Sequence, residues 1–212
     1  MPVVSIAKLR REYQGEPLNE SAVAPDPYTQ FQHWFDEAVR AELPQPNAMT
    51  LATVAVSGQP SARIVLLNSI DGDGFVFYTS YASRKGRELA ANARAALLFY
   101  WHELDREVRI EGSVAKITAA ESDAYFDSRP LGSRHAAIAS PQSETVTDRA
   151  ALEQRFAAAA QLGDRPPRPA HWGGYRLTPA AVEFWQGRPN RLHDRLLYAC
   201  AGEHWQLSRL AP

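Results

Sequence analysis

The chain has 212 residues, of which 45% are hydrophobic and 22% charged, and its formal net charge is −1. This length allows one domain with a substantial core, or two small ones. The near-neutral charge argues against a protein that binds nucleic acid or an anionic membrane, since both kinds usually carry a basic excess. The single cysteine excludes an intrachain disulfide and a cysteine-based zinc site. We expect Cys200 to be a small core residue and not a reactive thiol.

The sequence carries no signal for a membrane or a metal. No segment approaches the roughly 18 apolar residues of a membrane span, and the first residues lack the charge order of a signal peptide. We therefore expect a cytoplasmic protein. The histidines have no metal-ligand spacing, and the motifs of dinucleotide-binding loops, P-loops, serine hydrolases and zinc proteases are absent from the sequence. We expect no metal site.

The N-terminal part predicts an arm followed by a helix. Residues 1–24 are polar and mixed, which indicates an arm or lid that orders only against something else. We expect residues 25–212 to form a single domain. Its first element is a helix in "PDPYTQFQHWFDEAVRAEL", with Asp26 as N-cap. The apolar face of this helix consists of Phe31, Trp34, Phe35, Ala38 and Val39.

Strands dominate the rest of the chain. The expected elements are strands over 48–56, 61–68 and 75–80, a helix over 83–93, and strands over 95–101 and 106–117. Two or three helices then interrupt: Thr118 and Glu121 form a capping box before one, and Gly163 ends another. After a proline-rich linker, strands are expected over 172–178, 182–187, 191–199 and 205–212.

This order of elements predicts the fold class. Antiparallel strands joined by short turns, with helices inserted in two places, indicate a mostly β protein of the α+β class, an antiparallel barrel decorated by helices. Strands and helices do not alternate along the chain, which excludes a Rossmann fold and a TIM barrel.

Several basic residues lie where an anion could bind. Arg63 leads an apolar strand, where it marks either the solvent end of the strand or a ligand. Arg84 and Lys85 follow Ser83 in the first turn of a helix, where cations oppose the helix dipole. A bound phosphate would account for these cations, and so would a solvated first turn.

Two further stretches suit a phosphorylated ligand. Tyr125 and Arg129 are spaced to share one helix face, and Ser133 follows after a proline. Arginine with hydroxyl groups suits a phosphate ester. Gln142 and Ser143 supply neutral donors and acceptors of the kind that border a heterocycle. Each signal is weak alone, but together the cations exceed what one phosphate needs, which fits two phosphorylated ligands.

The stretch "FWQGRPNRLHDRL" places Arg191, His193 and Arg195 at every second position. In an extended chain these three side chains share one face. They form either a solvated surface or a cradle for an anionic, planar ligand.

The motifs "RIVLL", "FYTSYASRKGREL", "YFDSRPLGS", "HWGGYRL", "EFWQGRPNRLHDRLLY" and "RLAP" resemble those of the pyridoxamine 5'-phosphate oxidase family, over nearly the whole chain. The resemblance implies an FMN-binding split β-barrel and a homodimer that binds FMN between its subunits. It also implies the oxidation of pyridoxamine or pyridoxine 5'-phosphate to pyridoxal 5'-phosphate, with O2 as acceptor and H2O2 as second product.

The resemblance further implies roles for single residues. FMN would be bound by Arg63, Ile64, Val65, Leu66, Leu67, Asn68, Tyr78, Thr79, Arg84, Lys85, Glu107, Gln142, Ser143, Trp185 and Arg195. The substrate, a phosphorylated B6 vitamer, would be bound by Arg10, Tyr13, Asn68, Tyr125, Arg129, Ser133, Arg191 and His193. Arg191 and His193 would be the catalytic residues.

Three positions depart from the family pattern. Asn68 stands where the family usually has a lysine that binds the substrate phosphate, and a lost charge-assisted hydrogen bond costs roughly 1.5–3 kcal/mol. Glu107 replaces a glutamine, which predicts weaker FMN binding, a lower flavin potential or a protonated Glu107. Ala136 and Ile138 replace a glycine and a tryptophan, which changes the expected pocket shape.

These departures leave two alternatives. The flavin oxidases of phenazine biosynthesis resemble this family and tend to carry asparagine at the position of Asn68. A protein that binds FMN or a B6 vitamer without turnover is the second alternative.

Overall fold

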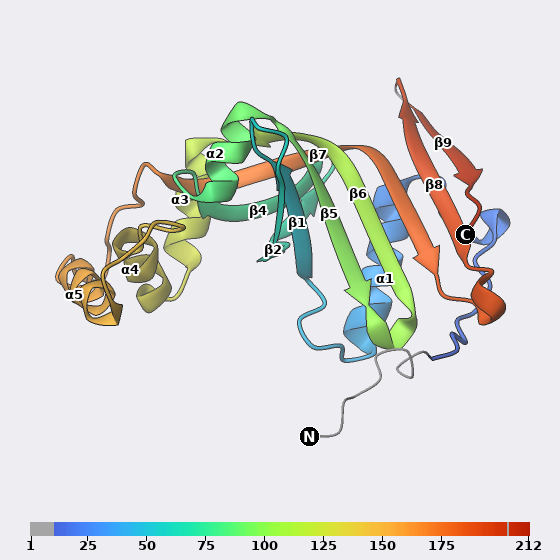
Figure 1. Cartoon of the computed structure of the whole chain (residues 1–212), viewed down its shortest axis with the longest axis horizontal. Coiled ribbons are helices and arrows are strands. Elements are labelled where there is room, and N and C mark those ends of the chain that lie inside the picture. The colour runs from blue at the N-terminus through green and yellow to red at the C-terminus, as the bar shows by residue number, and fades with distance from the viewer. Residues whose placement is uncertain (1–10, 203) are drawn as a thin grey trace. The chain divides into compact units, whose positions relative to one another are not determined.

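A computed structural model describes residues 11–202 and 204–212 (Figure 1). The chain divides into two compact units. Unit 1 comprises the described residues up to Pro46, with Leu98–Ile110 and Ala180–Pro212. Unit 2 comprises Asn47–Leu97 and Glu111–Pro179. The division into an arm over 1–24 and one domain over 25–212 stays a prediction.

The described residues form a mostly antiparallel sheet with inserted helices. The strands are β1 (Ala48–Val54), β2 (Pro60–Leu66), β3 (Ser69–Asp71), β4 (Gly74–Ser80), β5 (Arg94–Trp101), β6 (Arg106–Lys116), β7 (Trp172–Gln186), β8 (Asp194–Ala201) and β9 (His204–Arg209). The helices are α1 (Pro27–Arg40), α2 (Arg84–Ala91), α3 (Ala119–Ser128), α4 (Leu131–Ala139) and α5 (Arg149–Ala160). The strand order is β2-β1-β5-β6-β7-β4-β3, with β8 paired to β7 and β9 to β8. The predicted fold class is confirmed.

Unit 1 has its core between α1 and the ends of long strands. The Asp26 side chain accepts hydrogen bonds from the backbone N–H groups of Tyr28 and Thr29, as expected of an N-cap. Phe31 is buried against Phe99 of β5, with ring centroids 4.9 Å apart. Trp34 packs edge-on against Phe184 of β7 at 5.2 Å.

The prediction for the apolar face of α1 is wrong at one residue, Val39. Val39 is 51% exposed, because the buried stripe of the helix follows Phe31, Trp34 and Ala38 and leaves its other flank to solvent.

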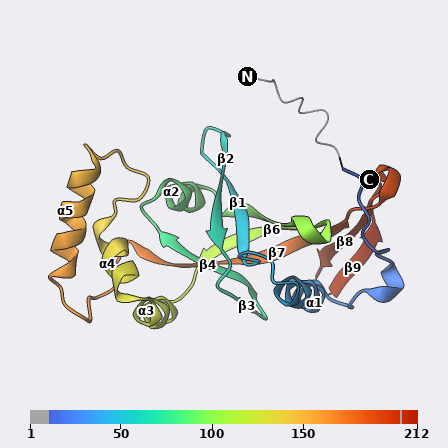
Figure 2. The same ribbon diagram turned by 90° about the horizontal axis from the view of Figure 1, so that it is seen from below.

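Unit 2 contains the predicted hairpin and the inserted helices (Figure 2). β1 and β2 pair antiparallel from Ala48 opposite Leu66 to Val54 opposite Pro60. The capping box of Thr118 and Glu121 is present at the start of α3. Figures 1 and 2 show α4 and α5 side by side. No helix within the described ranges is long and apolar enough to cross a membrane.

Several boundaries in the C-terminal half differ from the prediction, and the last strand, expected over 205–212, is β9 (His204–Arg209). The two strands expected over 172–178 and 182–187 are one strand, β7, because the φ that proline fixes at Pro179 is compatible with extended backbone. α3 ends at Ser128, so Arg129 is its extended C-cap and not part of a helix face. Ser133 lies inside the further helix α4.

The predicted strand over 191–199 starts later, which overturns the alternation argument. Residues 189–191 form a short 3-10 turn, in which Asn190 and Arg191 have positive φ angles of 57° and 64°. β8 begins only at Asp194, so Arg191 and His193 are not on an extended strand with Arg195. Cys200 is exposed near the end of β8 and is not a core residue.

Gly112 of β6 is a point of close approach in unit 2. A Cβ at this position would overlap the carbonyl oxygen of Thr178 and lie 2.9 Å from the Cα of Pro179. Both obstacles are backbone atoms, so they cannot rotate away as a side chain would.

We therefore expect Gly112→Ala to lower the free energy of unfolding by about 1–3 kcal/mol, the usual cost of overpacking. Urea unfolding followed by circular dichroism measures it. The matched control is Gly132→Ala in α4, where a Cβ meets no atom within 4 Å and stability is expected to stay equal or rise. Equal effects of the two substitutions would contradict this account.

Candidate active site

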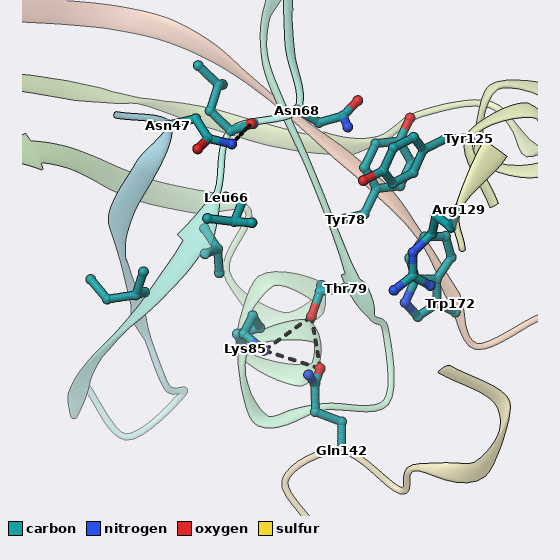
Figure 3. A pocket seen from close by; sticks show the side chains of 13 residues that line it. Asn47, Leu66, Asn68, Tyr78, Thr79, Lys85, Tyr125, Arg129, Gln142 and Trp172 are labelled. Atoms are coloured by element: carbon teal, nitrogen blue, oxygen red, sulfur yellow. Dashed lines mark hydrogen bonds between the residues drawn. The ribbon is translucent and has the colours of Figure 1, made fainter. Parts of the chain in front are cut away.

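A pocket of about 370 Å³ opens within unit 2 (Figure 3). It is lined by Asn47, Ile64, Val65, Leu66, Leu67, Asn68, Tyr78, Thr79, Lys85, Tyr125, Arg129, Gln142 and Trp172. These residues come from the position before β1, from the end of β2 and the two residues after it, from β4 and from the first turn of α2. The others come from α3 and its C-cap, from the loop after α4 and from the start of β7. All but Asn47 and Trp172 belong to the predicted site, so the fold gathers in one pocket residues that lie far apart in the sequence.

One side of the pocket carries a buried cation. Lys85 is 8% exposed, and its Nζ donates hydrogen bonds to Thr79 Oγ1 at 3.1 Å and Gln142 Oε1 at 3.2 Å. Burial, and then the charge of Arg63, lower the pKa of Lys85. Neither partner oxygen carries a charge, and no carboxylate among the described residues pairs with Lys85.

The opposite side is aromatic and carries a second cation. The rings of Tyr78 and Tyr125 stack at 3.9 Å, and Trp172 stacks on Tyr78 at 5.5 Å. The guanidinium of Arg129 lies over the ring of Trp172, 4.6 Å from its centroid. Burial lowers the pKa of Arg129, and its Nη1 is buried without a hydrogen-bond partner among the described residues.

These features fit a phosphorylated ligand. A buried cation without a counter-ion is unfavourable unless an anion joins it, which is the condition of Lys85. Arg129 adds a half-buried cation with no carboxylate partner among the described residues. The orphaned Nη1 offers a donor to such an anion. Within the described part of the chain, no carboxylate lines the pocket, so no acidic side chain there opposes a phosphate.

Two residues predicted to bind the FMN phosphate, Arg63 and Arg84, lie outside the pocket lining. Arg63 and Arg84 do not line the pocket but contact the buried carboxylate of Glu88. Glu88 accepts hydrogen bonds from Arg84 Nε at 2.9 Å and from Ser61 Oγ at 2.6 Å. Burial alone would raise the pKa of Glu88, but hydrogen bonds from Ser61, Thr53 and Arg84 outweigh it and lower the pKa to about 2.

Ser133 and Ser143 are not among the pocket residues either. Ser133 lies in α4, and Ser143 follows Gln142 with a positive φ of 73°. Arg10 lies outside the described residues.

Other predicted residues form an aromatic cluster in unit 1. The ring of Tyr13 meets those of Trp185 and His193 edge-on, at 5.5 and 5.2 Å. Trp185 and His193 are themselves 4.6 Å apart. The guanidinium of Arg191 lies 5.4 Å from the centroid of the Tyr13 ring.

The segment that carries Tyr13 is fixed by Asp105. This buried carboxylate pairs with Arg11 and accepts a hydrogen bond from the backbone N–H of Gln14 at 3.2 Å. Gly187 leaves room for the Tyr13 ring, because a Cβ there would lie 2.7 Å from the ring atom Cδ1.

Arg195 and Glu107 lie in a cluster of four charges, also in unit 1. Glu183 is buried and accepts hydrogen bonds from Arg195 Nε at 2.8 Å and Nη2 at 3.1 Å. Arg109 donates to the same carboxylate at 3.2 Å and lies 3.7 Å from Glu107. Burial raises the pKa of Glu107, and the charge of Glu183 adds to this. The three effects expected of Glu107 stay predictions.

The prediction from sequence missed the two carboxylates, Glu88 and Glu183, that pair with the arginines described above. Glu88 follows Arg84 by four positions, which is the spacing of a helical ion pair and a signal that was available. Glu183 precedes Trp185 by two positions in β7, so the alternation of a strand could have placed them on one face. Asn47 lies outside any recognisable motif.

Comparison with known proteins gives the same family over the whole chain. Residues 35–163 match the family model described as pyridoxamine 5'-phosphate oxidase, and residues 172–212 match the pyridoxine 5'-phosphate oxidase C-terminal dimerisation region. The pyridoxine/pyridoxamine 5'-phosphate oxidase of Thermosynechococcus vestitus is 62% identical, covering 98% of this chain and 99% of its own. That of Cupriavidus pinatubonensis is 60% identical, covering 99% and 100%.

Solved structures of related proteins share the fold of this chain. PhzG from Burkholderia lata, in complex with tetrahydrophenazine-1-carboxylic acid, has a TM-score of 0.88 at 34% identity, covering 93% of this chain and 99% of its own. An FMN-binding protein from Nostoc punctiforme, related to pyridoxamine 5'-phosphate oxidase, shares the fold at a TM-score of 0.71 and 18% identity, with coverage of 88% and 98%.

The shared fold defines the chain as a split β-barrel protein, as the sequence motifs predicted. The chain belongs to the pyridoxamine 5'-phosphate oxidase family.

The contacts of Glu88 generate a prediction about acid stability. A carboxyl whose pKa falls from 4.5 to about 2 on folding stabilises the native state fully above pH 4.5. This stabilisation is lost as the pH falls from 4.5 towards 2.

We therefore expect Glu88→Gln to lower the free energy of unfolding at pH 7 by about 1–3 kcal/mol, because charge-assisted hydrogen bonds become neutral ones. The difference from the unsubstituted chain should shrink between pH 4.5 and 2 in urea titrations. Glu153→Gln, which removes an exposed helical ion pair with Arg149, is the control and should change little at any pH. A difference that is constant with pH would contradict the account.

Proposed function

We propose that this chain catalyses the FMN-dependent oxidation of pyridoxamine or pyridoxine 5'-phosphate to pyridoxal 5'-phosphate, with O2 as acceptor and H2O2 as second product. The observation that carries the proposal is the pocket with two uncompensated cations, Lys85 and Arg129, beside an aromatic wall. Relatives of this name are about 60% identical over the full chain, which supports the same activity.

FMN is the proposed cofactor, and the flavin would accept a hydride from the C4' carbon of the substrate and pass the electrons to O2. The pocket fits its phosphate, because Lys85 is a buried cation with only neutral partners. The remaining proposed contacts in unit 2 are Arg63 to Asn68, Tyr78, Thr79, Arg84, Gln142 and Ser143. The family resemblance adds Glu107, Trp185 and Arg195 of unit 1.

The protein's own contribution is to bind and orient the substrate. We assign the substrate phosphate to Arg129 and Tyr125, with Asn68 at the same pocket. Ser133, which does not line this pocket, is added as a further ligand on the family resemblance alone. We assign Arg191 and His193 to the pyridine ring, with Arg10 and Tyr13 covering it. Pyridoxine phosphate gives the aldehyde directly, whereas pyridoxamine phosphate gives an imine that water hydrolyses to aldehyde and ammonia.

We also propose a homodimer with FMN bound between its subunits. The support is the match of residues 172–212 to a region described as a dimerisation region. In solution, sedimentation at micromolar concentration should give twice the mass of the 23.5 kDa chain.

An oxidase of the phenazine type is the second candidate. Asn68 and the structural likeness to PhzG favour it. The identity to PhzG is 34%, against 62% and 60% to the B6 oxidases, and this difference favours the B6 vitamer.

The direct test is aerobic turnover of pyridoxine 5'-phosphate at saturating FMN, followed by formation of the aldehyde. We expect turnover that depends on FMN and consumes one O2 per aldehyde. Bound FMN without turnover of either vitamer would contradict the proposal and favour the second candidate or a binding protein.

Asn68 should limit the affinity for the substrate phosphate. We expect Asn68→Lys to lower KM for pyridoxine 5'-phosphate by about 10-fold, because one charge-assisted hydrogen bond contributes about 1.5–3 kcal/mol. The dissociation constant of FMN, from flavin fluorescence, should change little. The control Asn68→Gln adds length without charge and should not lower KM. An unchanged KM in Asn68→Lys would mean that Asn68 does not face the substrate phosphate.

A further inference from the structure

The ring of His193 has one hydrogen bond among the described residues, and it fixes where the ring can carry a proton. The backbone N–H of Arg188 donates to His193 Nδ1 at 3.1 Å. An amide N–H can only donate to a ring nitrogen that has no hydrogen, so Nδ1 is unprotonated in this arrangement.

The donor is fixed by the turn that precedes β8. Arg188 has extended backbone angles, and the two left-handed residues Asn190 and Arg191 turn the chain back so that its amide meets the ring five residues later. The preceding residue, Gly187, is anchored by its own N–H, which donates to Asp105 O at 2.7 Å. The side chain of Arg188 bonds to Gly15 O and pairs with Asp194 at 3.3 Å.

The ring itself is also held in place. Tyr13 of the N-terminal segment and Trp185 of β7 pack against it, with centroids 5.2 and 4.6 Å away. These contacts leave the ring little freedom to flip and exchange its two nitrogens. No described residue forms a hydrogen bond with Nε2, so this atom is available to a ligand.

We propose that the Arg188 amide holds His193 as the neutral tautomer with its hydrogen on Nε2, and that His193 donates this hydrogen to an acceptor atom of the substrate. The substrate role rests on the proposed function. The tautomer itself does not. In this state His193 is a hydrogen-bond donor at its free nitrogen, and not a general base.

The electrostatic surroundings support the neutral form. Burial, and then the charge of Arg191 in the adjacent turn, lower the pKa of His193 below its usual value of 6.5. The Tyr13 ring also packs against the His193 ring, and the neighbouring Trp185 carries no charge. A second proton on Nδ1 would also face the Arg188 N–H, so the neutral form should persist below the pH at which an exposed histidine is half-protonated.

Nitrogen NMR of the full chain, labelled with 15N-histidine and saturated with FMN, tests the tautomer. The His193 signals are identified by their loss in His193→Gln. At pH 7 we expect Nδ1 to show the shift of an unprotonated ring nitrogen and Nε2 that of a protonated one. The opposite assignment, a mixture of tautomers, or a cationic ring at pH 7 would overturn the proposal. This readout does not depend on turnover.

Two substitutions test the donor role by steady-state kinetics. The amide nitrogen of a glutamine can occupy the place of Nε2 and retain the donor. An asparagine retains only an acceptor near Nδ1 for the Arg188 N–H. We expect His193→Asn to raise KM for pyridoxine 5'-phosphate about 3- to 10-fold, as one neutral hydrogen bond is lost, and His193→Gln to raise it less. FMN affinity should be equal in both.

A larger KM increase in His193→Gln than in His193→Asn would overturn the donor role. So would an equal loss of kcat in both at unchanged KM, since that would indicate proton transfer by His193. If the unsubstituted chain oxidises no B6 vitamer, the proposed function and the substrate role fail together, while the NMR result still decides the tautomer.

Discussion

The pocket depends on one constraint, which is that a buried cation needs an anion. Lys85 lies almost entirely out of water, and both of its partners are neutral oxygens. Transfer of a charge from water to such a site is costly unless a counter-ion arrives. The fold therefore leaves Lys85 without an anionic partner among the described residues, as the proposed phosphate site requires. On the aromatic side, the half-buried guanidinium of Arg129 also has an Nη1 without a hydrogen-bond partner among these residues.

The same rule explains why other cations are not free. Arg63 and Arg84 share the buried carboxylate of Glu88, and Arg195 and Arg109 share that of Glu183. A compensated arginine has a fixed direction and a smaller net field than a free one. Among the described residues, these four arginines thus have a carboxylate partner in the fold, whereas Lys85 and Arg129 have none.

Backbone geometry positions the hydrogen bond between the Arg188 amide and the ring of His193. The left-handed pair at Asn190 and Arg191 ends the run of extended residues before His193 and brings the Arg188 amide to its ring. Left-handed residues other than glycine are unfavourable, and they persist where the surrounding contacts determine them. Here those contacts are the anchored Gly187 and the packing of Tyr13 against Trp185 and His193.

The sequence by itself determined the antiparallel class, α1 with its Asp26 cap, the β1–β2 hairpin and the capping box of α3, because these follow from neighbours a few residues apart. Its motifs also named most residues of the pocket. Only the tertiary structure decided that Glu88 compensates Arg63, that Arg191 leaves the strand and that Cys200 is exposed. Ion pairing and burial depend on distances between elements remote in the chain, which local spacing does not fix.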